Sequence, residues 1–385
     1  MQKVIKKLVV VGSISLLTCW MIFSGCGSIT ALSALGTVGS AAATKVIEHK
    51  TGYGIQSPHT IIDRVMPSVV TIISELKAVS ITSSQGFIRP GEDMLSKPNN
   101  NAYQSGTGFV IKEDGTLITN YHVIANIIDK LDNAKLRVLF SNDSIYEAEI
   151  FNYDKISDIA ILKIVNDENK IFPAITWGDK PKLGGHAIII GSPIGLDFSV
   201  SFGIISAVDR ILPKASPPFV PYVQTDASMN RGNSGGPLFD ADGEVIGINT
   251  LILSPSTGTD IGSVGLGFSI DGQYAQEIIK RLGSGDKIKW SYMGIGYRLL
   301  NMDETKSNNL EFGSSVIIMN VSDNGAAYEV LKKNDIIQKM NGVVITHKNF
   351  ASMVARLAPG TKIILTLLRD GNIIDVDLVL TQRPV

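Results

Sequence analysis

The fold of this 385-residue chain is decided by the stretch Gly232-Asn233-Ser234-Gly235-Gly236-Pro237-Leu238. Glycines on both sides of a serine allow the backbone to turn sharply, so that the hydroxyl and the nearby N–H groups can face a bound molecule. A serine alone is a poor nucleophile and needs a histidine to take its proton, with a carboxylate to orient that histidine. The stretch therefore predicts a nucleophile at Ser234, and the chain order of its partners discriminates between fold classes.

Histidine is scarce, so its candidates for the base are few. His122 lies in Leu117-Ile118-Thr119-Asn120-Tyr121-His122-Val123-Ile124, where an apolar strand runs into a polar turn. His186 begins an apolar run and is more simply interpreted as a strand residue. The remaining histidines lie in or beside the N-terminal segment or near the C-terminus: His49, His59 and His347. His122 is therefore the candidate base.

The candidate acid is Asp158, at the polar end of the apolar run Ser157-Asp158-Ile159-Ala160-Ile161-Leu162. Taken singly, an aspartate there is more typical of a turn or cap, and its interpretation depends on the other two motifs. Gly-X-Ser-X-Gly also matches the elbow of α/β-hydrolases, but that fold runs serine, acid, histidine along the chain. The only histidine after Ser234 is His347, and the required βαβ context is missing. The order His122, Asp158, Ser234 is that of the chymotrypsin clan.

Strand patterning agrees with this order. Short β-type runs separated by turn signals recur from His59 to Leu282, without intervening helices, which is typical of an antiparallel barrel or sandwich. The clearest are Val69–Ile73, Gly108–Ile111, Leu136–Phe140, Ile159–Ile164, Ala187–Ile190, Gly203–Val208 and Glu244–Ile248. We expect an all-β double barrel over residues 59–283, interrupted by long loops at Ser80–Gln104 and Ile211–Pro221 and closed by a helix at Tyr274–Leu282.

A second, smaller α+β domain is predicted for residues 287–385, after a linker at Gly283-Ser284-Gly285-Asp286. Its expected strands and helix are Ser315–Met319, Lys362–Leu368, Ile373–Leu380 and Phe350–Leu357.

The N-terminal residues 1–26 have the pattern of an export signal. Lys3, Lys6 and Lys7 precede an uncharged stretch that ends at Phe23. Phe23-Ser24-Gly25-Cys26 resembles the bacterial lipobox, with phenylalanine where leucine is usual, and implies lipidation of Cys26. An N-terminal transmembrane anchor or an ordinary cleaved signal remains the alternative. Residues 27–58 are small and polar and are interpreted as a tether.

Composition excludes several other classes. A net charge of -1 gives no electrostatic basis for binding nucleic acid. Both cysteines, Cys19 and Cys26, lie in the N-terminal segment, so the rest of the chain has neither an internal disulfide nor a thiolate metal site. We expect no cofactor and no metal.

Three segments resemble the catalytic motifs of the HtrA/Deg family of serine proteases. They are Thr119–Ile124, Ser157–Ala160 and Thr225-Asp226-Ala227-Ser228-Met229-Asn230-Arg231-Gly232-Asn233-Ser234-Gly235-Gly236. The segments Val65–Val70, Gly191–Leu196 and Gly203–Ala207 also match the family, and the resemblance covers about residues 59–385. Tyr121 stands where many members have a second asparagine.

The resemblance implies the role of each residue. His122 would be the general base, Asp158 its orienting acid and Ser234 the nucleophile, with an oxyanion hole of backbone N–H groups from Gly232 to Ser234 that includes Asn233. Ser228 would lie at the base of the S1 pocket and, being uncharged, would not select Lys or Arg. Leu266 and Phe268 are candidates for the pocket wall, although alternating apolar residues are also typical of a plain strand.

The second domain resembles a PDZ domain at Ser291-Tyr292-Met293-Gly294-Ile295-Gly296. Backbone N–H groups of such a loop capture a peptide carboxylate, here at Tyr292, Met293, Gly294, Ile295 and Gly296. From this motif alone, a turn leading into a core strand is an equal interpretation.

The combined expectation is an ATP-independent serine endopeptidase of the bacterial envelope, facing the periplasm and tethered to the membrane as a lipoprotein. Its expected partners are unfolded or misfolded polypeptides, peptides with apolar C-termini at the PDZ domain, the membrane and a homotrimer of this chain. The alternative function is a chaperone or peptide-binding scaffold in which proteolysis is secondary.

Overall fold

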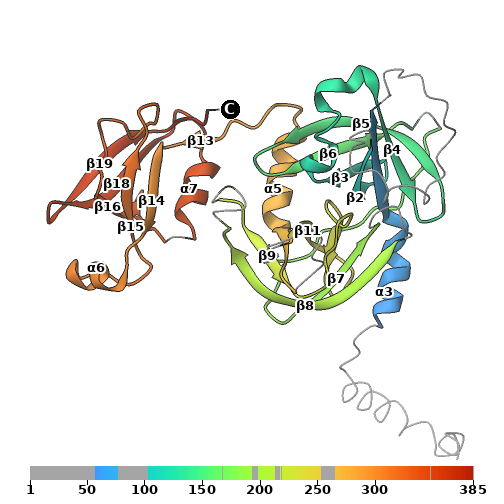
Figure 1. Cartoon of the computed structure of the whole chain (residues 1–385), viewed down its shortest axis with the longest axis horizontal. Coiled ribbons are helices and arrows are strands. Elements are labelled where there is room, and N and C mark those ends of the chain that lie inside the picture. The colour runs from blue at the N-terminus through green and yellow to red at the C-terminus, as the bar shows by residue number, and fades with distance from the viewer. Residues whose placement is uncertain are drawn as a thin grey trace, which may run out of the picture. The chain divides into compact units, whose positions relative to one another are not determined.

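Apolar runs between residues 69 and 164 close into an antiparallel barrel, called here the N-terminal barrel (Figure 1). The computed structural model describes residues 57–76, 103–166, 168–192, 198–212, 217, 219–252, 265–346 and 348–384. The strands follow the order β1-β2-β3-β6-β5-β4 around the barrel. Their bounds are β1 (Val69–Leu76), β2 (Tyr103–Lys112), β3 (Thr116–Thr119), β4 (Ala134–Phe140), β5 (Ile145–Asp154) and β6 (Ile159–Ile164).

A second closed barrel, the C-terminal barrel, follows in the order β10-β11-β12-β9-β8-β7. Its strands are β7 (His186–Gly191), β8 (Ser199–Arg210), β9 (Tyr222–Thr225), β10 (Pro237–Phe239), β11 (Val245–Ile252) and β12 (Gly267–Asp271). Closure pairs every strand on both sides, so neither barrel leaves an open edge.

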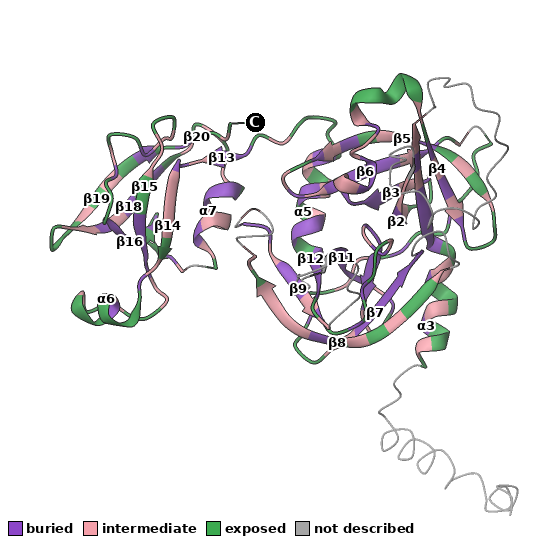
Figure 2. Ribbon diagram, in the orientation of Figure 1, coloured by how far each residue is buried: buried purple, intermediate pink, exposed green. Residues whose placement is uncertain are grey.

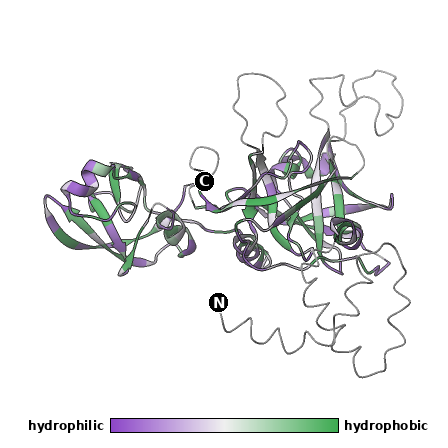
Figure 3. Cartoon of the chain, turned by 90° about the horizontal axis from the view of Figure 1, so that it is seen from below, coloured by the Kyte–Doolittle hydropathy of each residue, from purple (hydrophilic) through white to green (hydrophobic). Residues whose placement is uncertain are grey.

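The two barrels share one apolar core. Phe109 and Ile118 of the N-terminal barrel belong to the same buried cluster as Ile188 and Phe239 of the C-terminal barrel. Figure 2 shows buried residues along the strands of both barrels. Burial of each such side chain stabilises the fold by roughly 1.5–3 kcal/mol. In Figure 3 hydrophobic residues lie along strands of the barrels and of the C-terminal domain.

Short helices flank the barrels. α5 (Gly272–Leu282) starts at the cap Asp271, whose carboxylate accepts the N–H of Tyr274 at 3.0 Å. The others are α3 (Pro58–Val65), η2 (Met66–Ser68), α4 (Tyr121–Ile124) and η3 (Ile128–Asn133).

The C-terminal domain is built on a second antiparallel sheet, in the order β14-β15-β16-β18-β19, with β17 paired to β16. A buried ion pair between Asp335 and Arg369, at 2.6 Å, fixes β18 to the turn before β16. The elements are β13 (Ser291–Tyr292), β14 (Ile295–Leu299), α6 (Met302–Ser307), β15 (Val316–Val321), β16 (Ile336–Met340), β17 (Val343–Val344), α7 (Phe350–Arg356), β18 (Lys362–Arg369), β19 (Asn372–Val379) and β20 (Thr381–Gln382).

The predicted fold class, a double barrel followed by a small α+β domain, is confirmed. Every strand predicted above lies within or largely overlaps an observed strand, and the predicted helix at Tyr274–Leu282 is the body of α5. Most of Ser80–Gln104 and part of Ile211–Pro221 lie outside the described residues, as do Cys26 and the whole N-terminal segment. Among the helices that are described, none is long and apolar enough to cross a bilayer.

Candidate active site

The β5–β6 hairpin places Asp158. Its turn begins at Asp154, the last residue of β5, and ends at Asp158, directly before β6. Asp158 has a φ of +57°, in the left-handed region where aspartate and asparagine are tolerated better than most residues. The carboxylate of Asp154 accepts the N–H of Ser157 at 2.6 Å and so fixes the turn. Backbone geometry therefore presents the side chain of Asp158 at the lip of the N-terminal barrel.

Both the carboxylate and the backbone carbonyl of Asp158 hold the segment that ends in His122. The carboxylate of Asp158 accepts the backbone N–H of His122 at 2.9 Å and lies 2.7 Å from Nδ1 of the ring. Its carbonyl oxygen accepts the Nδ2 group of Asn120 at 2.8 Å and the N–H of Tyr121 at 3.1 Å. Because an ionised carboxylate only accepts hydrogen bonds, this contact suits the tautomer that carries its proton on Nδ1 and leaves Nε2 free to accept one.

Ser234 comes from the C-terminal barrel and is packed against the segment that leads to His122. Its carbonyl accepts the N–H of Thr107 at 2.9 Å. At Gly235, φ is +82°, and a Cβ atom would lie 2.2 Å from Oγ1 of Thr119 and 2.9 Å from the N atom of Asn120. Only glycine allows this approach, which brings the residue after Ser234 against the end of β3, three residues before His122.

Two of the three candidate oxyanion-hole groups are uncommitted. Within the described part of the chain, no backbone carbonyl accepts the N–H of Gly232 or Ser234. Asn233 differs, because its N–H donates to the carbonyl of Asn230 at 3.1 Å and closes the turn. The N–H of Asn233, which was included in the predicted hole, is therefore engaged within the turn, and those of Gly232 and Ser234 remain the candidate donors. Gly232 has a φ of +98°, which favours glycine there.

The residues predicted for the S1 pocket differ in how far they are exposed. Ser228 is exposed, and its carbonyl accepts the hydroxyl of Ser201 at 2.7 Å. Leu266 is 38% exposed, whereas Phe268 is 3% exposed and belongs to the shared barrel core. For Phe268 the plain-strand interpretation therefore describes the structure better. Met229 was not predicted; it is buried, and its sulfur would lie 3.3 Å from a Cβ atom at Gly267.

The predicted PDZ loop runs from β13 into β14, which is an edge strand of its sheet. The carbonyls of Met293 and Gly294 accept the N–H groups of Ala327 and Ser322, at 2.8 and 2.7 Å. Gly294 has a φ of +80°, and its backbone touches that of Gly325 so closely that a Cβ atom would overlap it. The loop carbonyls thus face the domain, and β14 has one edge without a paired strand among the described residues.

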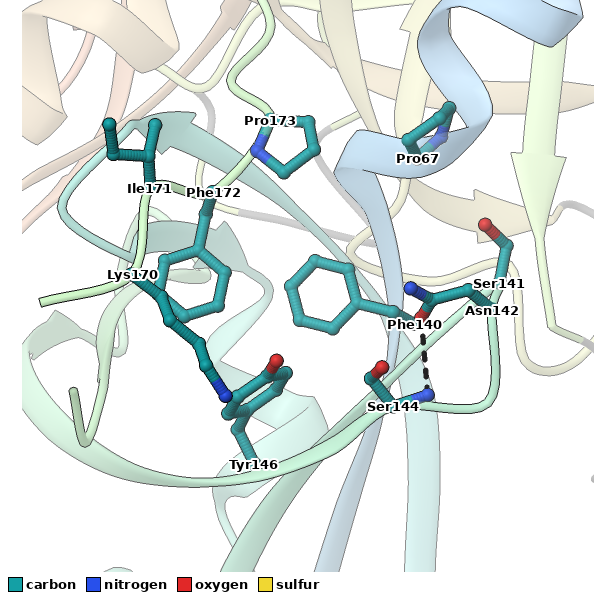
Figure 4. Close-up of a pocket in the computed structure, with 10 residues that line it drawn as sticks. All are labelled: Pro67, Phe140, Ser141, Asn142, Ser144, Tyr146, Lys170, Ile171, Phe172 and Pro173. Atoms are coloured by element: carbon teal, nitrogen blue, oxygen red, sulfur yellow. Dashed lines mark hydrogen bonds between the residues drawn. The ribbon is translucent and has the colours of Figure 1, made fainter. Parts of the chain in front are cut away.

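A cavity of about 400 Å³ lies elsewhere, on the N-terminal barrel (Figure 4). The rings of Phe140, Tyr146 and Phe172 pack together there, with Pro67 and Pro173 also at the wall. None of the candidate catalytic residues lines this cavity, so it is separate from the candidate active site.

Sequence reasoning missed the residues that support the triad. Asn120 and Tyr121 both donate to the carbonyl of Asp158, and the hydroxyl of Thr107 donates to the carbonyl of Gly232 at 2.6 Å. Burial, followed by the nearby Tyr153, raises the pKa of Tyr121 above its ordinary value of 10.0, so its ring is neutral. The only sequence feature that could have predicted these hydrogen bonds is the polar stretch directly before His122.

Two family models match the chain. Residues 106–248 match the trypsin-like peptidase domain, and residues 291–380 match the PDZ domain. A "Probable periplasmic serine endoprotease DegP-like" of Pseudomonas fulva is 37% identical over 275 residues, which cover 70% of this chain and 54% of that protein. A protein of the same description from Marinomonas sp. is 32% identical over 347 residues, covering 84% of this chain and 71% of that protein. The chain thus spans only about half the length of the first relative.

Solved structures agree with this match. The HtrA-type protease AlgW with tripeptide superimposes with a TM-score of 0.70 at 27% identity, covering 86% of this chain and 98% of that one. With its trypsin-like peptidase domain and its PDZ domain, this chain belongs to the HtrA/DegP family of serine endoproteases.

Proposed function

We propose that this chain is an ATP-independent endopeptidase that cleaves unfolded or misfolded proteins, with His122 as base, Asp158 as orienting acid and Ser234 as nucleophile. The observation that carries the proposal is the pair of contacts between the Asp158 carboxylate and His122, at 2.9 Å to the backbone N–H and 2.7 Å to Nδ1. These two contacts favour the tautomer that leaves Nε2 free to take a proton from a hydroxyl.

The reaction follows from these groups. Oγ of Ser234 attacks the peptide carbonyl while its proton passes to Nε2 of His122, and the same proton then goes to the leaving amine. The N–H groups of Gly232 and Ser234 stabilise the oxyanion that forms on the carbonyl oxygen. Water repeats the sequence in the second half of the reaction and releases the acyl group.

Replacement of Ser234 by alanine tests the proposal. We expect casein cleavage to fall by about six orders of magnitude, as when the nucleophile of subtilisin is removed. Ser141→Ala, at an exposed turn between β4 and β5, is the matched control and should cleave casein like the wild type. Equal cleavage by wild type and Ser234→Ala would refute the assignment.

The second candidate function is a chaperone or peptide-binding scaffold, favoured by the unpaired edge of β14. In that case neither wild type nor Ser234→Ala cleaves casein, and both suppress aggregation of an unfolded protein to the same extent.

We also propose the organisation that serves this function. Residues 59–283 form the protease domain and 287–385 the PDZ domain, which binds peptides with apolar C-termini beside Tyr292–Gly296 and thereby regulates proteolysis. A homotrimer is proposed from the family resemblance and would be checked by light scattering.

Location is a proposal as well. Residues 1–26 direct export, and acylation of Cys26 tethers the chain in the periplasm, in line with the periplasmic description of its relatives. Cys26→Ser should abolish palmitate labelling and release the protein from membranes. Labelling that persists in this variant would exclude Cys26 as the acylated residue, and an unlabelled but membrane-bound wild type would indicate the transmembrane anchor.

A further inference from the structure

The end of β5 holds the linker that follows the protease domain. The amide of Asn152, which is 4% exposed, donates to the carbonyl of Leu282 at 2.9 Å and to that of Asp286 at 3.0 Å. The next residue, Tyr153, has the ammonium group of Lys287 3.4 Å from its ring centroid. Two consecutive residues of β5 therefore fix both ends of the linker.

The third residue of this series, Asp154, binds Trp290. The indole N–H of Trp290 donates to Oδ1 of Asp154 at 2.9 Å, and the two side chains are buried, with Trp290 only 3% exposed. The indole ring lies 4.9 Å from that of Phe219, and the guanidinium of Arg281 lies 5.1 Å from it. The turn between β5 and β6 closes through contacts within these two strands, so it does not need the contacts around Trp290 in order to form.

The other oxygen of Asp154 points into the catalytic turn. Oδ2 accepts the N–H of Ser157 at 2.6 Å, one residue before Asp158. A single buried carboxylate thus joins the indole of Trp290 to the backbone that sets Asp158 in its left-handed conformation. A buried carboxylate oxygen that loses its donor is costly, and the group reorients or takes up water to regain one.

A second series of contacts, through Tyr153, also joins the linker to the His122–Asp158 pair. The ring of Tyr153, below Lys287, lies 5.3 Å from the ring of Tyr121. Tyr121 precedes His122 and donates its N–H to the carbonyl of Asp158. Both routes lead from residues 287–290 to the His122–Asp158 pair.

We propose that Asp154 and Trp290 are positioning residues of the protease, so that docking of residues 287–290 onto β5 holds Asp158 in the geometry that orients His122. Neither residue touches substrate. The proposal rests on the catalytic roles assigned above, and it assigns to the linker a part in the chemistry of the protease domain.

The experiment uses the full-length chain with Trp290→Phe, which keeps the aromatic ring on Phe219 but removes the donor to Asp154. Trp177→Phe is the matched control, because Trp177 is a protease-domain indole whose ring packs edge-on to Phe109. The probe is a fluorophosphonate. Oγ of Ser234 displaces fluoride from phosphorus as His122 takes the hydroxyl proton, so the labelling rate reports activation of the nucleophile without peptide binding.

We expect Trp290→Phe to label about tenfold more slowly at a temperature well below its unfolding midpoint, a change that corresponds to ~1.4 kcal/mol. For a short chromogenic peptide, kcat should fall by the same factor with KM unchanged, because the interaction acts on the triad and not on binding. Asp154 accepts from both Trp290 and Ser157, and asparagine has only one acceptor oxygen, so Asp154→Asn must give up one of these contacts and should also label more slowly. The double variant should lose no more than the more affected single variant, because its one acceptor oxygen is free to bind Ser157.

The outcomes separate this proposal from the proposed function. If the wild type and Trp177→Phe are not labelled, the nucleophile assignment fails. If they are labelled and Trp290→Phe labels equally fast, or if its losses add to those of Asp154→Asn, the contact is structural only and the positioning proposal is overturned. A lower unfolding midpoint together with an unchanged labelling rate has the same meaning.

Discussion

Residue 158 adopts a left-handed backbone conformation and also carries the carboxylate that contacts His122. Its φ of +57° costs an ordinary L-residue roughly 1–2 kcal/mol, whereas aspartate and asparagine adopt it more readily. Its carboxylate accepts from both the backbone N–H and Nδ1 of His122. These two properties can be separated by substitution.

We predict that Asp158→Asn keeps the fold and loses the chemistry. Asparagine tolerates the left-handed turn but carries no negative charge, so kcat should fall by about 10⁴, as for the same change in a trypsin-type triad. Asp158→Ala should show a similar loss of kcat and also a lower thermal midpoint, by roughly 2–4 °C, because alanine is strained at this φ. Peptide hydrolysis and circular dichroism melts measure the two effects. More than a tenth of wild-type kcat in Asp158→Asn would contradict the role of the acid.

The sequence singled out Asp158 as the candidate acid, and the structure places it against His122, but its other contacts had no sequence signal. With so few histidines, chain order alone joined His122, Asp158 and Ser234. The contact between Asp154 and Trp290 joins residues 136 positions apart, and no local pattern marks it. The engagement of the Asn233 N–H by Asn230 is likewise a matter of turn geometry, which the composition of the stretch does not reveal.

Among the elements, apolar runs were predicted well and amphipathic strands poorly. β6 and β7 are buried along almost their whole length, so each appears in the sequence as a continuous apolar run. β5 alternates between exposed and buried positions and carries charged residues on its outer face, so no such run marks it. Short helices such as α4 and α6 lack the length that helical periodicity needs.

Helix α6 supplies a prediction of pH dependence. Arg298, and then the backbone N–H of Asn301, hold the pKa of Glu304 at about 2, below its ordinary 4.5. Asn301 and Glu304 also cap each other's backbone at 2.8 Å. A carboxyl group whose pKa is lowered by folding stabilises the fold above its unfolded pKa, and this stabilisation is lost as the pH falls through the folded pKa.

The thermal midpoint of Glu304→Gln should therefore lie below that of the wild type at pH 6, and the gap should narrow from about pH 4.5 down to about pH 2. Scanning calorimetry across this range measures it. Glu311→Gln is the control, because Glu311 is exposed and the described chain gives it no ion pair. A gap that stays constant with pH would show that the charge of Glu304 contributes nothing.

For the whole molecule, the roles proposed for the PDZ domain and for the linker can be tested separately. We predict that a peptide with an apolar C-terminus speeds cleavage of a reporter too short to reach the groove, tenfold for each ~1.4 kcal/mol by which the peptide prefers the active state. A chain ending after Trp290 should lose this response and keep its basal rate. A chain ending after Asp286 should also lose basal rate, because it lacks the indole that binds Asp154.

Fluorogenic assays of both truncated chains, with gel filtration to show that they are folded, measure these effects. A response that persists without the PDZ domain would place the activating site elsewhere. If the intact chain does not respond either, the domain serves only as a substrate tether and the regulatory proposal fails.

His122 and Asp158 belong to the N-terminal barrel, whereas Ser234 belongs to the C-terminal one. Of these three residues the serine is translated last, and its turn contacts Thr107 and Thr119 of the other barrel. If these residues act as proposed, a chain whose two barrels have not yet packed together has no complete triad. The division of the proposed triad between two barrels would thus make proteolytic activity depend on completed folding.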